Sequence, residues 1–221
     1  MLEEINFSDK DELYILGDIV DRGPDAFSVF DYIVSHDNVY LIMGNHEKMM
    51  MDFIRSVNYN VAYSKGLTYG PNARYQYQLW MNNGGGITYD QLLEKSEEEQ
   101  QKIIETFDNL PFYKTVEVNG QKFLLCHARP VFNKYMTFEE NLEYLEHEEE
   151  ILWCRSTVPQ HIPKNYIVIH GHSPVQYLFD DDKIVKYSYG EIIDIDCGCA
   201  GAYKLACLRL DDMQEFYVDC E

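Results

Sequence analysis

Polar side chains suited to metal and phosphate chemistry stand directly after a short apolar run near the start of the sequence. In Gly17-Asp18-Ile19-Val20-Asp21-Arg22-Gly23, two carboxylates lie three residues apart and an arginine follows the second. A carboxylate can hold a metal ion, and a guanidinium can bind two phosphate oxygens at once. The flanking glycines permit a tight turn. Taken alone, the segment fits such a site and also fits a surface salt bridge at a turn.

The elements that must position these residues are a buried strand before them, Leu13-Tyr14-Ile15-Leu16, and a helix after Pro24. Three other apolar runs, 39–43, 123–125 and 166–169, also end in polar residues. Those residues are Gly44-Asn45-His46-Glu47, Cys126-His127-Ala128-Arg129 and His170-Gly171-His172-Ser173-Pro174. Open α/β sheets place ligand sites at the carboxyl ends of their strands. We therefore expect the four polar groups to meet.

This order of motifs resembles the calcineurin-like metallophosphoesterases, and most closely their bacterial and phage serine/threonine protein phosphatases and diadenosine tetraphosphatases. The resemblance covers nearly the whole sequence, and four motifs in order are far more specific than one. It implies an α/β fold, a four-layer α-β-β-α sandwich of two mixed sheets that lacks its first strand. It also implies a metal-dependent hydrolase of phosphoesters.

The resemblance assigns Asp18, Asn45, His127 and His172 to one metal site, with Asp18 bridging to a second ion. A carboxylate, an amide oxygen and two imidazoles suit manganese, iron or zinc better than calcium, and we expect Mn²⁺. Any one of these histidines alone would more often be a satisfied buried group. Four such residues in motif order favour the metal site.

The resemblance also assigns the groups that would act on the substrate. His46 would be the general acid for the leaving oxygen, oriented by Asp21, and an imidazole suits that task near neutral pH. Arg22 and Arg155 would hold the phosphate oxygens, because the planar guanidinium binds two oxygens at once. The short match Trp153-Cys154-Arg155 makes Arg155 the less specific assignment.

One motif of the family is absent. A strand ending in Asp-x-His precedes the first helix in the family, and nothing precedes Met1 in this sequence. Two-metal phosphoesterases hold their ions about 3.5–4 Å apart, and here only Asp18 would reach the second ion, so we expect that ion to be weakly bound or lost. The sequence fits an N-terminally shortened active enzyme or a degenerate relative that binds phosphate without turnover. We favour the first because the other site residues are all present.

Two further polar residues lie next to the motifs. His170 is two residues before His172, and a minor alternative is that it supports or replaces a ligand. Arg129 stands where the family commonly has glycine. It would either hold phosphate or point to solvent, and we expect solvent.

Composition limits the partners. The 221 residues carry a net charge of −20, which disfavours nucleic acid and anionic membranes as partners. No apolar run reaches the roughly 20 residues of a membrane span, and no signal peptide is recognisable, so we expect a soluble, cytoplasmic protein. The six cysteines lack the spacing of a zinc site or a disulfide scaffold, so we expect reduced thiols.

We expect a single domain, 1–221, with a tyrosine-rich, cap-like insertion at about 58–110. Its aromatic residues could cover the active site or simply pack as helices. The last third, from Tyr166, is predicted to be mostly short strands. Asn119-Gly120 predicts a hairpin, and Ser96 and Thr137 predict the starts of two helices.

The leading hypothesis is a serine/threonine-type phosphoprotein phosphatase, or a phosphatase of small phosphorylated molecules. One alternative is symmetric hydrolysis of diadenosine tetraphosphate, with aromatic residues between 59 and 80 stacking on adenine. Another is a noncatalytic phosphate-binding module.

Overall fold

The segment 17–23 lies between a strand and a helix. The computed structural model describes residues 1–57, 70–145, 150–158, 160, 162 and 165–220. In it, strand β1 (Leu13–Ile15) precedes the segment, and helix α1 (Ala26–Val34) follows it. Strand β2 (Val39–Leu41) then returns and pairs with β1 in parallel. The predicted strand–helix–strand crossover is therefore confirmed, and the turn after β1 lies beside the turn after β2.

The largest sheet supplies the other two polar turns. Its strands are β3 (Tyr113–Val118), β4 (Gln121–Cys126), β5 (Tyr166–His170), β6 (Val185–Tyr187) and β7 (Ile192–Asp194). Their order is β3-β4-β5-β7-β6, in which β4, β5 and β7 are parallel and the edge strands β3 and β6 are antiparallel to their neighbours. Since β4 and β5 are parallel, the turns that follow them meet at one edge of the sheet.

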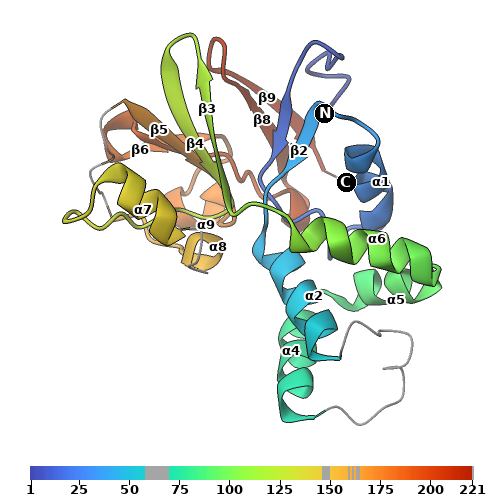
Figure 1. Ribbon diagram of the computed structural model, residues 1–221. Coiled ribbons are helices and arrows are strands. Elements are labelled where there is room, and N and C mark those ends of the chain that lie inside the picture. Colours follow the sequence, from blue (N-terminus) through green and yellow to red (C-terminus); the bar gives the residue numbers. More distant parts are fainter. Residues whose placement is uncertain (58–69, 146–149, 159, 161, 163–164, 221) are drawn as a thin grey trace.

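A C-terminal hairpin of β8 (Lys204–Arg209) and β9 (Gln214–Asp219) forms a third sheet. The predicted α/β class is confirmed, but the described strands form three sheets rather than two. No described hydrogen bond joins β1 to β8, and a cavity lined by residues of both strands lies between them. The hairpin and the pair β1–β2 are therefore separate sheets. Figure 1 shows the hairpin beside the pair β1–β2.

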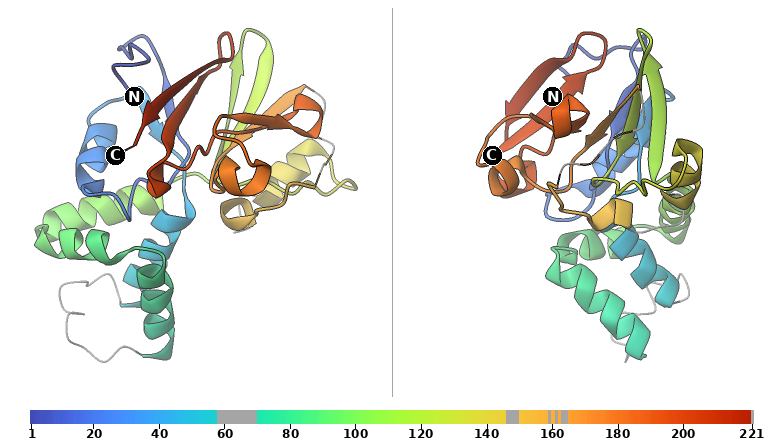
Figure 2. Two further views of the ribbon diagram at one scale, coloured as in Figure 1. Left: turned by 180° about the vertical axis from the view of Figure 1, so that it is seen from behind. Right: turned by 90° about the vertical axis from the view of Figure 1, so that its left-hand side faces the viewer.

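The layers follow from the apolar clusters. On one face of the five-stranded sheet, Leu124 and Val168 pack against helices α7 (Phe138–Leu145) and α8 (Glu150–Trp153). On the opposite face, Phe123, Leu125 and Ile193 pack against side chains of β8 and β9. Helix α1 packs against β1 and β2 in a separate cluster. Figure 2 shows this succession of helices and sheets from two further directions.

The segment between β2 and β3 is helical where the structure describes it. It contains α2 (Asn45–Ser56), α4 (Pro71–Asn82), α5 (Gly86–Glu94) and α6 (Glu97–Asp108). These helices share a core around the fully buried ring of Trp80. The described part of the insertion is thus helical, and its role as a cap stays a prediction. Tyr59, Tyr63 and Tyr69 lie outside the described residues.

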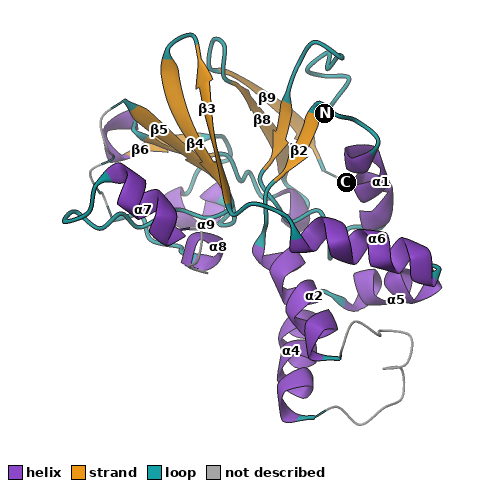
Figure 3. Ribbon diagram, in the orientation of Figure 1, coloured by secondary structure: helices purple, strands orange, loops and turns teal. Residues whose placement is uncertain are grey.

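Local signals in the sequence are confirmed. Ser96 caps α6, and its hydroxyl accepts a hydrogen bond from the Glu99 N–H. Thr137 does the same for α7. Asn119-Gly120 forms the turn between β3 and β4, with φ values of 52° and 80°. The short elements that remain are α9 (Val175–Phe179), η1 (Ser188–Gly190) and η2 (Cys199–Gly201), and Figure 3 separates helices from strands by colour.

The expectation that all cysteines are reduced is wrong. Cys199 and Cys220 form a disulfide across a sequence separation of 21 residues. The pairing is invisible in the sequence because it joins η2 to the end of β9, where Cys220 N–H donates to the Tyr203 carbonyl. The other four cysteines carry free thiols.

No helix in the described part of the chain has the length and apolar character needed to span a membrane.

Candidate metal and phosphate site

Four side chains from four turns converge at one point. Oδ1 of Asn45 lies 2.8 Å from Nε2 of His127 and 2.9 Å from Nδ1 of His172. Oδ2 of Asp18 lies 3.4 Å from Nε2 of His127. The candidate ligand atoms of Asp18, His127 and His172 all lie within 4.8 Å of one another. The structure therefore brings together the four residues predicted to bind metal.

The tautomer of His127 tests whether a cation fits this cluster. Nδ1 of His127 lies 2.6 Å from the Leu16 carbonyl, which can only accept, so Nδ1 carries the proton. In the neutral ring, the form that binds metal, Nε2 then presents a lone pair to Oδ1 of Asn45 and to the Asp18 carboxylate, which are also acceptors. Acceptors that face one another without a proton repel, and a cation between them removes the repulsion.

His172 also fits a metal ligand. Burial, followed by the positive charge that His127 carries when it is protonated, lowers the pKa of His172 to about 3. The ring is thus neutral near pH 7, the form that binds metal. Its Nδ1 is the nitrogen that faces the cluster, 2.9 Å from Oδ1 of Asn45, whereas its buried Nε2 has no hydrogen-bond partner among the described residues. The donor set of two nitrogens and two kinds of oxygen suits a transition metal.

The turn after β1 is a strained backbone segment. Asp18, Asp21 and Arg22 have φ values of 58°, 72° and 60°, in the left-handed region. Non-glycine residues there cost about 1–3 kcal/mol each. A side chain at Gly17 is excluded because a Cβ would lie 2.5 Å from Cα of Gly44. The two polar turns therefore touch backbone to backbone, which brings Asp18 next to the start of α2.

Glu47, for which the motifs in the sequence predicted no role, holds this strained turn. Its carboxylate accepts hydrogen bonds from the N–H groups of Asp18 and Ile19, both at 2.8 Å, and from that of Val20 at 3.3 Å. It also accepts from the Gly44 N–H at 2.9 Å. Burial, followed by the charge of Asp18, raises the pKa of Glu47. A signal was present, because a glutamate at the third position of a helix often accepts from the residue before that helix.

His46 and Asp21 form a buried pair beside the metal cluster. Nδ1 of His46 lies 2.6 Å from Oδ2 of Asp21. Burial opposes the charged imidazole, but the hydrogen bond to Asp21 and the charge of Asp18 outweigh it, so the pKa of His46 lies above its ordinary value. The pair has the geometry of an imidazole oriented by a carboxylate.

Arg22 faces the same point from the turn. Its Nη2 donates to Nε2 of His46 at 2.9 Å, and its Nε donates to the Asn83 carbonyl at 3.2 Å. Gly84 is close, since a Cβ there would lie 2.8 Å from Cγ of Arg22. The turn between α4 and α5 thus holds the guanidinium at Nε, and Nη2 lies beside His46.

The two other arginines differ from each other. Arg155 is exposed, and its positive charge acts on His172, where it is one of the lesser causes of the lowered pKa after burial and His127. Arg129, expected to point to solvent, is instead buried and donates to the carbonyls of Ser156 (2.5 Å) and Val158. That expectation was wrong because the segment after α8 folds back over Arg129.

His170 is part of the core. Its Nε2 lies 2.7 Å from the Tyr187 hydroxyl, and its Nδ1 lies 3.0 Å from the Gly171 carbonyl. Burial lowers the pKa of His170 to about 4. His170 is not among the residues whose candidate ligand atoms lie together, which are Asp18, His127 and His172.

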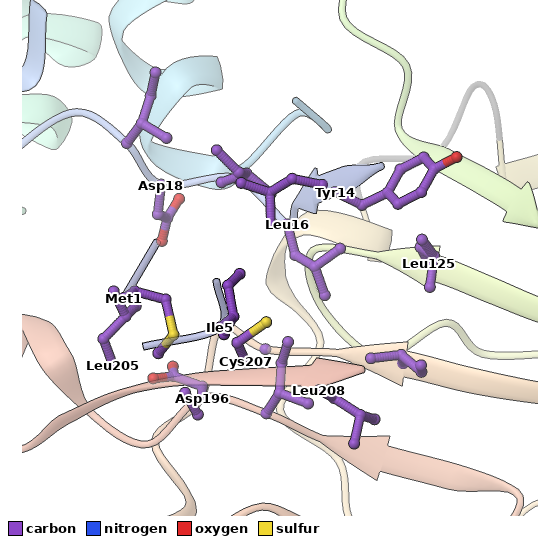
Figure 4. Close-up of a pocket in the computed structure, with 18 of the residues that line it drawn as sticks. Met1, Ile5, Tyr14, Leu16, Asp18, Leu125, Asp196, Leu205, Cys207 and Leu208 are labelled. Carbon is purple, nitrogen blue, oxygen red and sulfur yellow. The ribbon is translucent and has the colours of Figure 1, made fainter. Parts of the chain in front are cut away.

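A cavity of about 1690 Å³ extends from this cluster between β1 and β8. Asp18, His46 and His172 are among the residues that line it, together with apolar side chains such as Leu16 and Leu208 and charged ones such as Lys114 and Arg209. Figure 4 shows Asp18 and Asp196 among these apolar side chains. The polar cluster is therefore accessible from an open groove.

A candidate metal-ligand cluster at strand ends, beside a histidine–aspartate pair and an arginine, is typical of metal-dependent hydrolases. A family model described as calcineurin-like phosphoesterase matches residues 1–197. The chain belongs to the calcineurin-like phosphoesterase family, whose members are metal-dependent hydrolases.

Relatives of two kinds are similar to the chain. Serine/threonine-protein phosphatase 2 of Salmonella typhimurium is 26% identical over 205 residues, which is 90% of this chain and 81% of the relative. The symmetrical bis(5'-nucleosyl)-tetraphosphatase of Buchnera aphidicola is 47% identical over 49 residues, only 21% of this chain and 18% of the relative.

Solved structures share the fold. The crystal structure of a protein described as a candidate diadenosine tetraphosphatase superposes on this chain with a TM-score of 0.63 at 14% sequence identity. The superposition covers 100% of this chain and 86% of that one. A hypothetical protein of Pyrococcus horikoshii OT3 gives 0.53 at 13% identity, covering 100% of this chain and 78% of that one. At such identities these matches support the fold alone.

Proposed function

We propose that this protein hydrolyses phosphomonoesters and acts as a serine/threonine-type phosphoprotein phosphatase. The observation that carries the proposal is the meeting of a metal-ligand cluster, the His46–Asp21 pair and Arg22 in the lining of the cavity. The similarity to a protein phosphatase over 90% of the chain supports this substrate class.

Asp18, Asn45, His127 and His172 would hold a divalent metal, for which we propose Mn²⁺, with iron or zinc as alternatives. Such an ion supplies Lewis-acid chemistry, by neutralising phosphoryl oxygens and acidifying water. The described residues place one carboxylate, Asp18, at this cluster together with one amide and two imidazoles. We therefore propose one well-bound ion and a weak second one.

Arg22 and His46 would act together on the substrate. A bound phosphate group would attract Arg22 to its oxygens, because an arginine–phosphate pair is charge-assisted and binds through two N–H groups. Nε2 of His46 would then be free to carry the proton that the leaving oxygen needs. Asp21 stabilises the protonated ring through the bond at Nδ1. Arg155 would hold the phosphate from the side of His172.

The test is hydrolysis of p-nitrophenyl phosphate and of a phosphoserine peptide with added Mn²⁺. General acids account for about 10²–10⁴-fold of rate, so His46→Ala should lower kcat for the phosphoserine peptide by that order. The loss for p-nitrophenyl phosphate should be smaller, because its leaving group needs less protonation. The matched control is His36→Ala, since His36 bonds to the Tyr32 carbonyl at the end of α1. No turnover by the wild-type protein, or an unchanged rate of His46→Ala on the phosphoserine peptide, would refute the proposal.

The second candidate is symmetric hydrolysis of diadenosine tetraphosphate, which the 47% identity to the Buchnera enzyme over 49 residues favours. This activity predicts adenosine diphosphate as the sole product, and chromatography of the products separates the two activities. A noncatalytic phosphate-binding protein would instead bind one metal ion and phosphate without turnover, which metal counting and calorimetry would reveal.

A further inference from the structure

The carboxylate that orients His46 is itself held by a residue of the helical segment. Nε1 of Trp80 lies 3.0 Å from Oδ1 and 3.0 Å from Oδ2 of Asp21, 59 residues away in sequence. The indole N–H can only donate, and an ionised carboxylate can only accept. Asp21 therefore receives one hydrogen bond from His46 and a shared one from Trp80.

The indole has little freedom to move. Trp80 is fully buried and lies 5.7 Å from the ring of Phe53 and 6.1 Å from that of Tyr89, measured between ring centroids. A Cβ at Gly85 would lie 2.4 Å from Nε1 of Trp80. The glycine thus leaves the space through which the N–H reaches Asp21.

The backbone of Asp21 is fixed by the same segment. Its N–H donates to Oγ1 of the buried Thr88 at 2.8 Å, while Arg22 N–H donates to the Gly84 carbonyl at 3.4 Å. The side chain and main chain of Asp21 are therefore both held by residues of α4, α5 and the turn between them. Figure 1 shows α4 beside α2, the helix that begins at the site.

We propose that Trp80 is a positioning residue for the proton-donating group, acting through Asp21. Without its N–H, the Asp21 carboxylate can rotate about its terminal torsion, which is broad for such groups. His46 then loses a fixed partner for Nδ1, and its Nε2 is no longer held toward the cavity. The helical segment is thereby part of the site, although Trp80 does not touch the substrate.

The first test uses Trp80→Phe and needs no turnover. In protein labelled with ¹⁵N-histidine, the Nδ1–H proton of His46 should be protected from water in the wild type, because the bond to Asp21 is 2.6 Å long and buried. In Trp80→Phe this resonance should broaden or vanish through exchange. A resonance as sharp and as protected as that of the wild type would overturn the proposal.

The second test is kinetic and rests on the proposed function. Groups that orient a site residue typically account for about 10- to 100-fold of activity, so Trp80→Phe should lower kcat by that order with KM nearly unchanged. The loss should be greater for phenyl phosphate than for p-nitrophenyl phosphate, whose leaving group needs less protonation. In the His46→Ala background, Trp80→Phe should cause no further loss. An equal loss in both backgrounds would show a merely structural role.

Phe53→Leu is the matched control, because Phe53 packs on the indole and is fully buried within the same cluster. It should lower Tm without changing the ratio of rates for the two substrates. If Trp80→Phe does not fold, replacement of Trp80 by β-(3-benzothienyl)alanine keeps the ring shape and removes the N–H. If wild-type protein shows no turnover, the proposed function fails, and the resonance of His46 still decides the role of Trp80.

Discussion

Replacing Glu47 by glutamine tests whether its carboxylate holds the strained turn of the site. Both carboxylate oxygens accept, with Oε2 bonded to the N–H groups of Asp18 and Gly44 and Oε1 to those of Ile19 and Val20. Glu47→Gln replaces one oxygen by an amide donor. Whichever way the amide lies, one buried and one half-buried N–H group lose their acceptor.

The size of the effect follows from these contacts. An unsatisfied buried donor costs about 1–3 kcal/mol, so two N–H groups cost roughly 2–6 kcal/mol. Burial raises the pKa of Glu47, which means that its charge is costly in the folded protein. The neutral variant avoids that cost, so we expect a net loss in the lower part of the range, about 2–3 kcal/mol. For a chain of this size, this corresponds to a fall in Tm of roughly 4–12 °C.

Urea unfolding and calorimetry of apo and Mn²⁺-loaded protein measure this loss. The metal-induced rise in Tm should also shrink in Glu47→Gln, because the loosened turn carries Asp18. The exposed Glu117→Gln on β3 is the control, with a change within about 0.5 kcal/mol. A Glu47→Gln variant as stable as the wild type, with the same metal-induced rise, would refute the role assigned to Glu47.

Three other outcomes follow from single contacts. His127→Ala should abolish the Mn²⁺-induced rise in Tm, which in the wild type corresponds to about 2.7 kcal/mol at a metal concentration 100 times Kd; a persisting rise in scanning fluorimetry would contradict the ligand assignment. Gly84→Ala should raise KM for phosphomonoesters, because φ is 102° and the new Cβ would lie 2.8 Å from Cγ of Arg22. Gly70→Ala is the control and should leave KM unchanged, because no described atom lies within 4 Å of the position of its Cβ. Cys220→Ser should lower stability by about 3 kcal/mol, the usual value for a loop of this order. Mass spectrometry of the wild-type protein, alkylated under denaturing conditions without reduction, should find four labelled thiols rather than six.

The sequence allowed the polar side chains that meet at the site to be foreseen. Asp18, Asn45, His127 and His172 each follow an apolar strand, and parallel strands bring such turns to one edge. The βαβ crossover, the Asn119-Gly120 hairpin and the Ser96 cap could be read for the same reason. Each depends on residues that are neighbours in sequence, where periodicity, turn geometry and capping act directly.

Contacts between distant residues could not be foreseen. The bond between Trp80 and Asp21 spans 59 residues, and Glu47 reaches 29 residues back to the N–H of Asp18. Arg129 was expected in solvent, but it lies under the segment of Ser156 and Val158. Cys199 and Cys220 were expected as thiols, but η2 and the end of β9 bring them together.

The sequence by itself determined which groups can bind metal and phosphate. The chemistry of a side chain is fixed by its residue type, and the local sequence pattern shows which residues directly follow a strand. Only the tertiary structure decided which groups hold those residues in place. Burial and hydrogen bonding depend on what packs nearby in space, and at this site the packing partners of Asp18 and Asp21 come from helices α2, α4 and α5.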